Sequence, residues 1–153
     1  MARNQFVHVI IDLGRSFSEV NLTAIEASHN LLVVCTPERL GMRGVAESQR
    51  IFRELLHLPG DPRQYVLNHP SPYAPIPSEE VERGLGVQFA ASIPFGGDAP
   101  ARAALEGHPL VTRFPTSPTS KAINRLADLL EQQLTEARAL TRSSTVAVSD
   151  RGY

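Results

Sequence analysis

Residues 31–38 are Leu-Leu-Val-Val-Cys-Thr-Pro-Glu, and this stretch decides the fold class of the 153-residue chain. The run Leu31–Cys35 is apolar without alternation, which is typical of a strand buried on both faces of a sheet. Pro37 ends the strand, because proline has no N–H to donate and restricts the residue before it. Glu38 begins a segment with helical spacing of apolar residues, up to about Leu58. A buried strand that leads into a helix favours α/β architecture.

The same alternation extends in both directions along the chain. The predicted strands are Phe6–Ile11, Leu31–Cys35, Gln64–Leu67 and Gln88–Ile93, and the predicted helices begin near Ser18 (as N-cap), Glu38, Ser78, Ala99 and Pro118. Strands that alternate with helices imply right-handed crossovers and parallel pairing. We therefore expect an α/β fold with a mostly parallel sheet flanked by helices, in which the last three strands are adjacent in sequential order.

Composition and charge exclude several classes of protein. The chain has 15 Lys and Arg and 16 Asp and Glu, so its net charge is -1. Proteins that bind nucleic acid through their overall charge are basic, so we do not expect nucleic acid as a partner. The apolar runs are too short to span a bilayer, and the first residues lack the apolar core of a secretory signal. A single cysteine excludes an internal disulfide. We expect one cytoplasmic domain over residues 1–140, with a last helix that ends near Ala139 and a disordered tail over 141–153.

Asp12 is the first candidate for chemistry, because it directly follows a run of β-branched residues. Ligands of open α/β sheets lie beyond the carboxyl ends of the strands. A carboxylate there can hold Mg²⁺ beside a nucleotide phosphate, as a Walker B aspartate does. The alternative is that Asp12 only forms a turn at the end of its strand.

The order of several motifs resembles the MinD/ParA-type P-loop ATPases over about residues 6–138. The matching stretches are Val9–Leu13, Ser18–Ser28, Leu31–Glu38, Val66–Asn68, Ser92–Phe95 and Ala104–Leu110. Within that family the sequence looks most like the CpaE/TadZ subgroup, the ATPases of Flp pilus assembly. The resemblance implies ATP and Mg²⁺ as cofactors, with Asp12 as the Walker B aspartate at the metal.

The resemblance also implies two residues of a purine nucleotide site. Asn68 matches the asparagine that contacts the base, and its amide can donate to and accept from a purine edge. Pro94 and the loop after it would line the adenine pocket. The alternatives are that Asn68 caps the turn after its strand and that Pro94 only terminates a strand.

The chain departs from the family in the residues that bind the phosphates of the nucleotide. No Walker A sequence G-x-x-x-x-G-K-[ST] occurs, and the single lysine, Lys121, is in the last predicted helix. The chain therefore resembles the C-terminal half of such an ATPase. In the family the P-loop strand lies between the strands that match Phe6–Ile11 and Leu31–Cys35. Without it, these strands pair directly, the first is displaced, or another chain fills the space.

Three hypotheses about function follow. The first is a CpaE/TadZ-like protein of pilus assembly or cellular positioning that does not hydrolyse ATP by itself. The second is half of an active ATPase whose P-loop is supplied by another chain, so that enzymatic activity stays open. The third is an unrelated α/β binding module. Exposed strand edges favour a homo-oligomer or a partner protein, and the mixed charges of the last helix argue against a membrane anchor.

Overall fold

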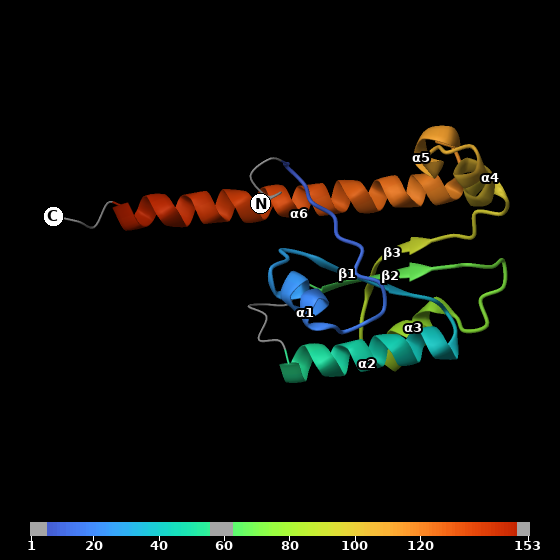
Figure 1. The fold of residues 1–153 in the computed structure, drawn as a ribbon, viewed down its shortest axis with the longest axis horizontal. Helices are drawn as coiled ribbons and strands as arrows, with labels where there is room; N and C mark the ends of the chain where they lie inside the picture. The colour runs from blue at the N-terminus through green and yellow to red at the C-terminus, as the bar shows by residue number, and fades with distance from the viewer. Residues whose placement is uncertain (1–5, 56–62, 150–153) are drawn as a thin grey trace.

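The computed structural model describes the backbone of residues 6–55 and 63–149, and the side chains of residues 6–54 and 63–136. A parallel sheet lies between two layers of helices (Figure 1). The strands are β1 (Leu31–Cys35), β2 (Arg63–Asn68) and β3 (Phe89–Ile93). The helices are α1 (Glu19–Glu26), α2 (Arg39–Leu55), α3 (Ser78–Leu85), α4 (Ala99–Leu105), α5 (Leu110–Arg113) and α6 (Pro118–Ser149).

The order of the sheet is β1-β2-β3, and both pairs are parallel. Val33 lies opposite Tyr65, and Tyr65 lies opposite Phe89. The register between β2 and β3 shifts by one residue after Tyr65, so that Val66 lies opposite Ala91. The predicted fold class and the sequential order of these strands are confirmed.

Each face of the sheet has its own core, because successive side chains of a strand point to opposite faces. On one face, α2 and α3 cover the sheet around a cluster of Cys35, Val45, Tyr65, Leu67 and Val81. On the other face, α6 packs on the sheet around a cluster of Val66, Ile93 and Ala122. Thus Tyr65 and Leu67 face α2 and α3, while Val66 between them faces α6.

A smaller cluster joins α1 to α2 and β1. Ile25 and Phe52 are buried in it, and the ring of Phe17 packs edge-on against Phe52 with 6.0 Å between centroids. Ser18 caps α1 as predicted, since its hydroxyl accepts a hydrogen bond from the backbone N–H of Asn21 at 3.3 Å.

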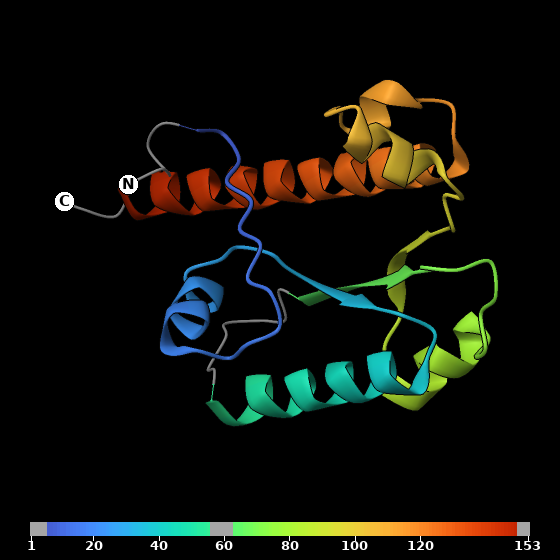
Figure 2. The ribbon, with the colours of Figure 1, turned by 45° about the vertical axis from the view of Figure 1, so that its right-hand side comes forward.

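The prediction of a strand over Phe6–Ile11 is wrong. These residues have no strand conformation and run from beside α6 to the loop before α1 (Figures 1 and 2). Their apolar side chains are exposed, Ile10 by 95% and Phe6 by 64%. Among the described residues, β1 has no second neighbour to which this segment could pair. Of the arrangements considered from the sequence, direct pairing of this segment with β1 is contradicted.

Two other boundaries differ from the sequence prediction. Residues 110–113 form the short helix α5, which is not among the helices predicted from the sequence. The last helix runs to Ser149 instead of ending near Ala139, so the tail expected to be disordered is helical to that point. The helix predicted to begin at Glu38 was expected to end near Leu58, which lies outside the described residues. In the described part of the chain, no helix is both long enough and apolar enough to cross a membrane.

Candidate functional site

The carboxyl edge of the sheet brings together two of the three predicted site residues. Asn68 is the last residue of β2 and lies opposite Ile93, and Pro94 follows Ile93 directly. The backbone N–H of His69 donates to the carbonyl of Ile93 at 2.9 Å, which extends the pairing of the strands past their ends. Asn68 and Pro94 are both half-buried. An amide side chain and a proline therefore lie at the ends of neighbouring strands, at the edge where open α/β sheets bind ligands.

The start of α6 fixes the loop that contains Pro94. The hydroxyl of Thr119 donates to the carbonyl of Pro94 at 3.1 Å, and Thr119 is almost completely buried. Ser120 is fully buried, and its backbone N–H donates to the hydroxyl of Ser117 at 3.1 Å. The sequence indicated that a helix opens here but gave no signal of a tertiary bond from Thr119. This bond attaches the loop at Pro94 to the first turn of α6.

His69 and Ser92 are two further residues at this edge, and the sequence did not predict their contact. His69 Nε2 and Ser92 Oγ lie 3.1 Å apart, within hydrogen-bond distance. Ser92 lies opposite Leu67 in the sheet, one position before the pair of Asn68 and Ile93. The spacing of histidine and serine in the sequence carries no hint of this contact, because it depends on the register of β2 and β3.

Asp12, the predicted metal residue, lies in the loop before α1. Its carboxylate accepts a hydrogen bond from the backbone N–H of Gly14 at 3.2 Å, and Gly14 has a positive φ of 64°. The amide of Asn21 donates to the carbonyls of Leu13 and Ser16, both at 2.8 Å, and so holds the loop in place. These bonds make Asp12 the first residue of a tight turn. The carboxylate has further acceptor sites that this bond does not use, so its role at a metal stays a prediction.

The described residues do not fit a triphosphate with Mg²⁺. Lys121, the single lysine of the chain, is exposed on α6. The search of the described part of the chain found no cluster of three His, Cys, Asp or Glu side chains that could hold a metal ion. Asp12 already accepts a backbone hydrogen bond within its own loop. The two candidate residues at the carboxyl edge, Asn68 and Pro94, carry no charge and so cannot themselves neutralise a phosphate.

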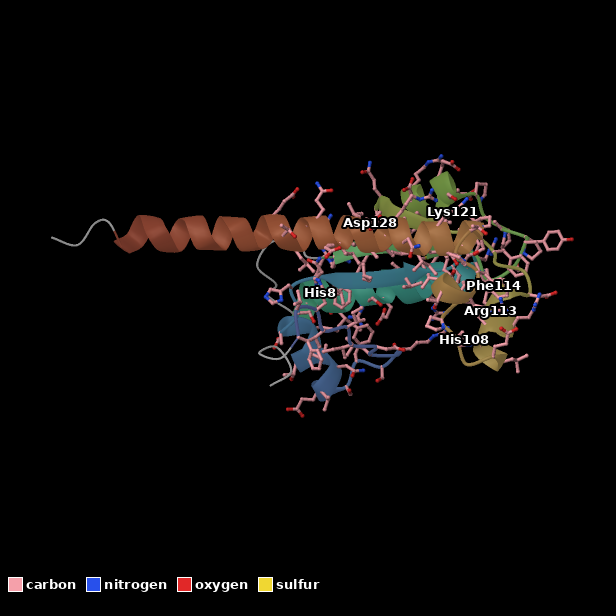
Figure 3. All side chains as sticks on the ribbon, turned by 90° about the horizontal axis from the view of Figure 1, so that it is seen from above. His8, His108, Arg113, Phe114, Lys121 and Asp128 are labelled. Carbon is pink, nitrogen blue, oxygen red and sulfur yellow. The ribbon has the colours of Figure 1, made fainter. Side chains whose placement is uncertain are left out.

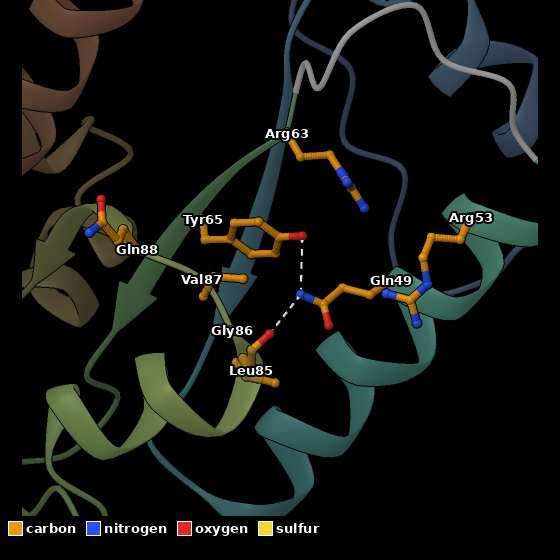
Figure 4. Close-up of a pocket in the computed structure, with 8 residues that line it drawn as sticks. All are labelled: Gln49, Arg53, Arg63, Tyr65, Leu85, Gly86, Val87 and Gln88. Carbon is orange, nitrogen blue, oxygen red and sulfur yellow. Dashed lines mark hydrogen bonds between the residues drawn. The ribbon is translucent and has the colours of Figure 1, made fainter.

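A separate open pocket of about 380 Å³ lies at the opposite end of the sheet (Figure 4). Gln49 closes one side of it by donating hydrogen bonds to the hydroxyl of Tyr65 at 3.3 Å and to the carbonyl of Leu85 at 3.2 Å. Arg63, the first residue of β2, contributes a cationic side chain. Because this pocket is at the amino ends of the strands, it is distinct from the edge that carries Asn68 and Pro94.

Two arginine side chains lie together where α4 meets α5. The guanidinium groups of Arg102 and Arg113 lie 5.4 and 5.0 Å from the centre of the Phe114 ring. Arg113 also bonds to Glu106, and this hydrogen bond lowers the pKa of the Glu106 carboxyl. Figure 3 shows Arg113 and Phe114 at the end of the molecule far from His8. Arg113 is thus neutralised by Glu106, and the ring contacts hold the two short helices together.

The single cysteine provides a test of the core next to the carboxyl edge. Cys35, the last residue of β1, is 1% exposed, and burial raises the pKa of its thiol. Because the thiolate is the reactive form, we expect a thiol reagent to modify native Cys35 far more slowly than the same protein in urea. Mass spectrometry of timed samples measures both rates. Native labelling as fast as that of a free thiol would contradict the burial of β1.

Comparison with known proteins identifies the fold. No protein-family model matches the sequence, and no curated protein matches it. Among solved structures, a ParA family ATPase from Chlorobium tepidum TLS is similar with a TM-score of 0.73 and 26% identity, over 80% of this chain and 50% of that one. The cell division ATPase MinD of Pyrococcus furiosus is similar with a TM-score of 0.69 and 25% identity, over 86% of this chain and 54% of that one.

A third structure is the septum site-determining protein MinD of Pyrococcus horikoshii OT3, complexed with Mg-ADP. It gives a TM-score of 0.62 with 20% identity, over 78% of this chain and 48% of that one. The chain thus spans about half the length of the structures it matches. The parallel sheet and its helices have the fold of the ParA and MinD ATPases.

Proposed function

We propose that this chain is a CpaE/TadZ-like member of the ParA/MinD-type proteins that acts in pilus assembly or cellular positioning. It works in the cytoplasm as a localisation or scaffold partner and does not hydrolyse ATP by itself. The likeness to ParA and MinD structures supports the relation to these ATPases. The motifs around Leu31–Glu38 support the narrower assignment to the pilus subgroup.

One observation carries the proposal that hydrolysis is absent. The fold is that of an ATPase, yet the chain has no Walker A sequence and its one lysine is on α6. Phosphoryl transfer depends mostly on positioning and on neutralising charge at the β- and γ-phosphates. The one candidate Mg²⁺ carboxylate, that of Asp12, accepts a hydrogen bond from Gly14 in a surface turn. Neither Asn68 nor Pro94 carries a charge that could hold or polarise the phosphates of a nucleotide bound beside them.

A weak site for a purine is still compatible with the carboxyl edge. Asn68 can donate to and accept from a base, and Pro94 is held beside it by the bond from Thr119. Such a site would recognise the base and not the phosphate chain. Its ligand is then any purine nucleotide, and ATP has no advantage over ADP or AMP.

An assay of ATP hydrolysis by the purified 153-residue chain with Mg²⁺ tests the proposal. We expect release of inorganic phosphate at the background rate, unchanged by Asp12→Ala. Glu19→Ala is the matched control, because it removes an exposed carboxylate at the start of α1 without touching the loop of Asp12. Turnover above background that Asp12→Ala abolishes and Glu19→Ala preserves would refute the proposal.

A further inference from the structure

The pocket at the amino end of the sheet contains a buried hydroxyl group whose proton is unused. Tyr65 is only 8% exposed, and its hydroxyl is directed into the pocket (Figure 4). The carbonyl of Leu85 can only accept a hydrogen bond, so the amide nitrogen of Gln49 must face it. The same nitrogen donates to the hydroxyl of Tyr65 at 3.3 Å. The hydroxyl is the acceptor in that bond, and among the described residues its own proton has no acceptor.

Arg53 brings a positive charge to the same pocket. It follows Gln49 by four residues on α2, so the two side chains are neighbours on one face of the helix. Other charges of α2 neutralise each other, since Arg50 forms ion pairs with Glu47 and Glu54. Within the described part of the chain, no carboxylate pairs with Arg53. Its guanidinium group is therefore available to an anion in the pocket.

The other walls of the pocket suit a small organic group. Leu85 and Val87 contribute aliphatic side chains, and the residues that line the pocket include no Asp or Glu. Its volume of about 380 Å³ lies within the range of small-molecule sites, about 300–1,000 Å³. Arg63 also lines the pocket but has another interaction of its own, so Arg53 is the cation that we consider available.

We propose that this pocket binds the carboxylate group of a small monocarboxylic acid. One carboxylate oxygen accepts the proton of the Tyr65 hydroxyl, and the guanidinium of Arg53 forms charge-assisted hydrogen bonds to the carboxylate. One unpaired guanidinium balances the single charge of a carboxylate, whereas a phosphate monoester carries about two charges. The aliphatic part of the acid lies against Leu85 and Val87.

This inference goes beyond the proposed function. The pocket is at the end of the sheet opposite Asn68 and Pro94, and its ligand is not a nucleotide.

Titration of the full chain with butyrate, at constant ionic strength and followed by calorimetry, tests the proposal. We expect a dissociation constant of about 1 mM, the affinity of a few polar contacts. Butyramide has nearly the same shape without the charge and should bind at least about tenfold more weakly, because hydrogen bonds to a charged group are the stronger ones. Inorganic phosphate that binds more tightly than butyrate would overturn the assignment of the ligand.

Three variants locate the binding site. Arg53→Gln should weaken the binding of butyrate at least about tenfold, because it removes the charge of the pocket. Tyr65→Phe keeps the ring and removes the hydroxyl, so it should weaken binding at least about threefold. Arg43→Gln is the matched control, because it removes the same charge from an exposed position of α2 outside the pocket. This control should bind butyrate like the unaltered chain.

Circular dichroism and thermal unfolding establish that each variant is folded. An unaltered chain that binds no butyrate up to about 20 mM would overturn the proposal. So would binding that Arg53→Gln leaves unchanged, or that Arg43→Gln weakens as much as Arg53→Gln does. The test with Arg53→Gln stands even if Tyr65→Phe does not fold, because Arg53 is exposed.

Discussion

Leu67→Ala should lower the free energy of unfolding by about 2–5 kcal/mol, the usual cost of such a truncation in a core. Leu67 is completely buried in the central strand and packs between α2, α3 and the sheet. Removing its side chain leaves a cavity that strands on both sides prevent from collapsing. The free energy of unfolding of a whole domain is only about 5–15 kcal/mol, so urea denaturation should show a large shift of the midpoint.

Leu40→Ala removes the same atoms from a surface position and serves as the control. Leu40 is 80% exposed, so its truncation should change the free energy of unfolding by no more than about 0.5 kcal/mol. Equal losses in the two variants would mean that the central strand is not the core of the fold.

Gly41→Ala should lower the free energy of unfolding by about 1–3 kcal/mol, as expected for overpacking. A β-carbon at this position would lie 2.6 Å from the carbonyl oxygen of Thr36 and still closer to its hydroxyl. Thr36 follows β1 directly, so α2 starts in close contact with the end of the strand. The backbone at Thr36 and the first turn of α2 would have to move apart, which disrupts the junction between β1 and α2. Thermal or urea unfolding measures the loss.

Gly44→Ala is the control on the same helix. A β-carbon there meets no atom within 4 Å, and alanine is a better helix former than glycine by about 1 kcal/mol. Gly44→Ala should therefore leave the stability unchanged or raise it. A stabilising effect at both glycines would show that α2 and the end of β1 are not in close contact.

The central part of the fold could be predicted because local and tertiary signals agree there. Leu31–Cys35 is apolar on both faces and is followed by a proline, and the structure has a strand with these bounds. Phe6–Ile11 has the same kind of composition, yet it is exposed and not a strand. A strand needs a neighbour for its hydrogen bonds, and a sequence pattern cannot supply one. Among the described residues, β2 is the only strand beside β1, and this follows from the order of the sheet and not from the composition of one segment.

The candidate site shows the same division. The order of motifs was enough to place Asn68 and Pro94 on neighbouring strands at one edge, because strand ends follow from strand positions. The contacts that define their surroundings, from Thr119 to Pro94 and between His69 and Ser92, depend on register and on where α6 begins. Asp12 was assigned from its place after a predicted strand. Once that segment is not a strand, its carboxylate forms a turn with Gly14.

Titration of the purified chain with ATP, ADP and AMP, with and without Mg²⁺, most directly tests the proposal that this chain, whose fold is that of the ParA and MinD ATPases, lacks a phosphate site. The account predicts dissociation constants of about 1 mM or weaker that agree among the three nucleotides within about threefold, because a few hydrogen bonds to a base supply little free energy. Asn68→Ala should weaken the binding of all three nucleotides by the same factor. ATP bound at least about tenfold more tightly than AMP, in a manner that requires Mg²⁺, would contradict the account.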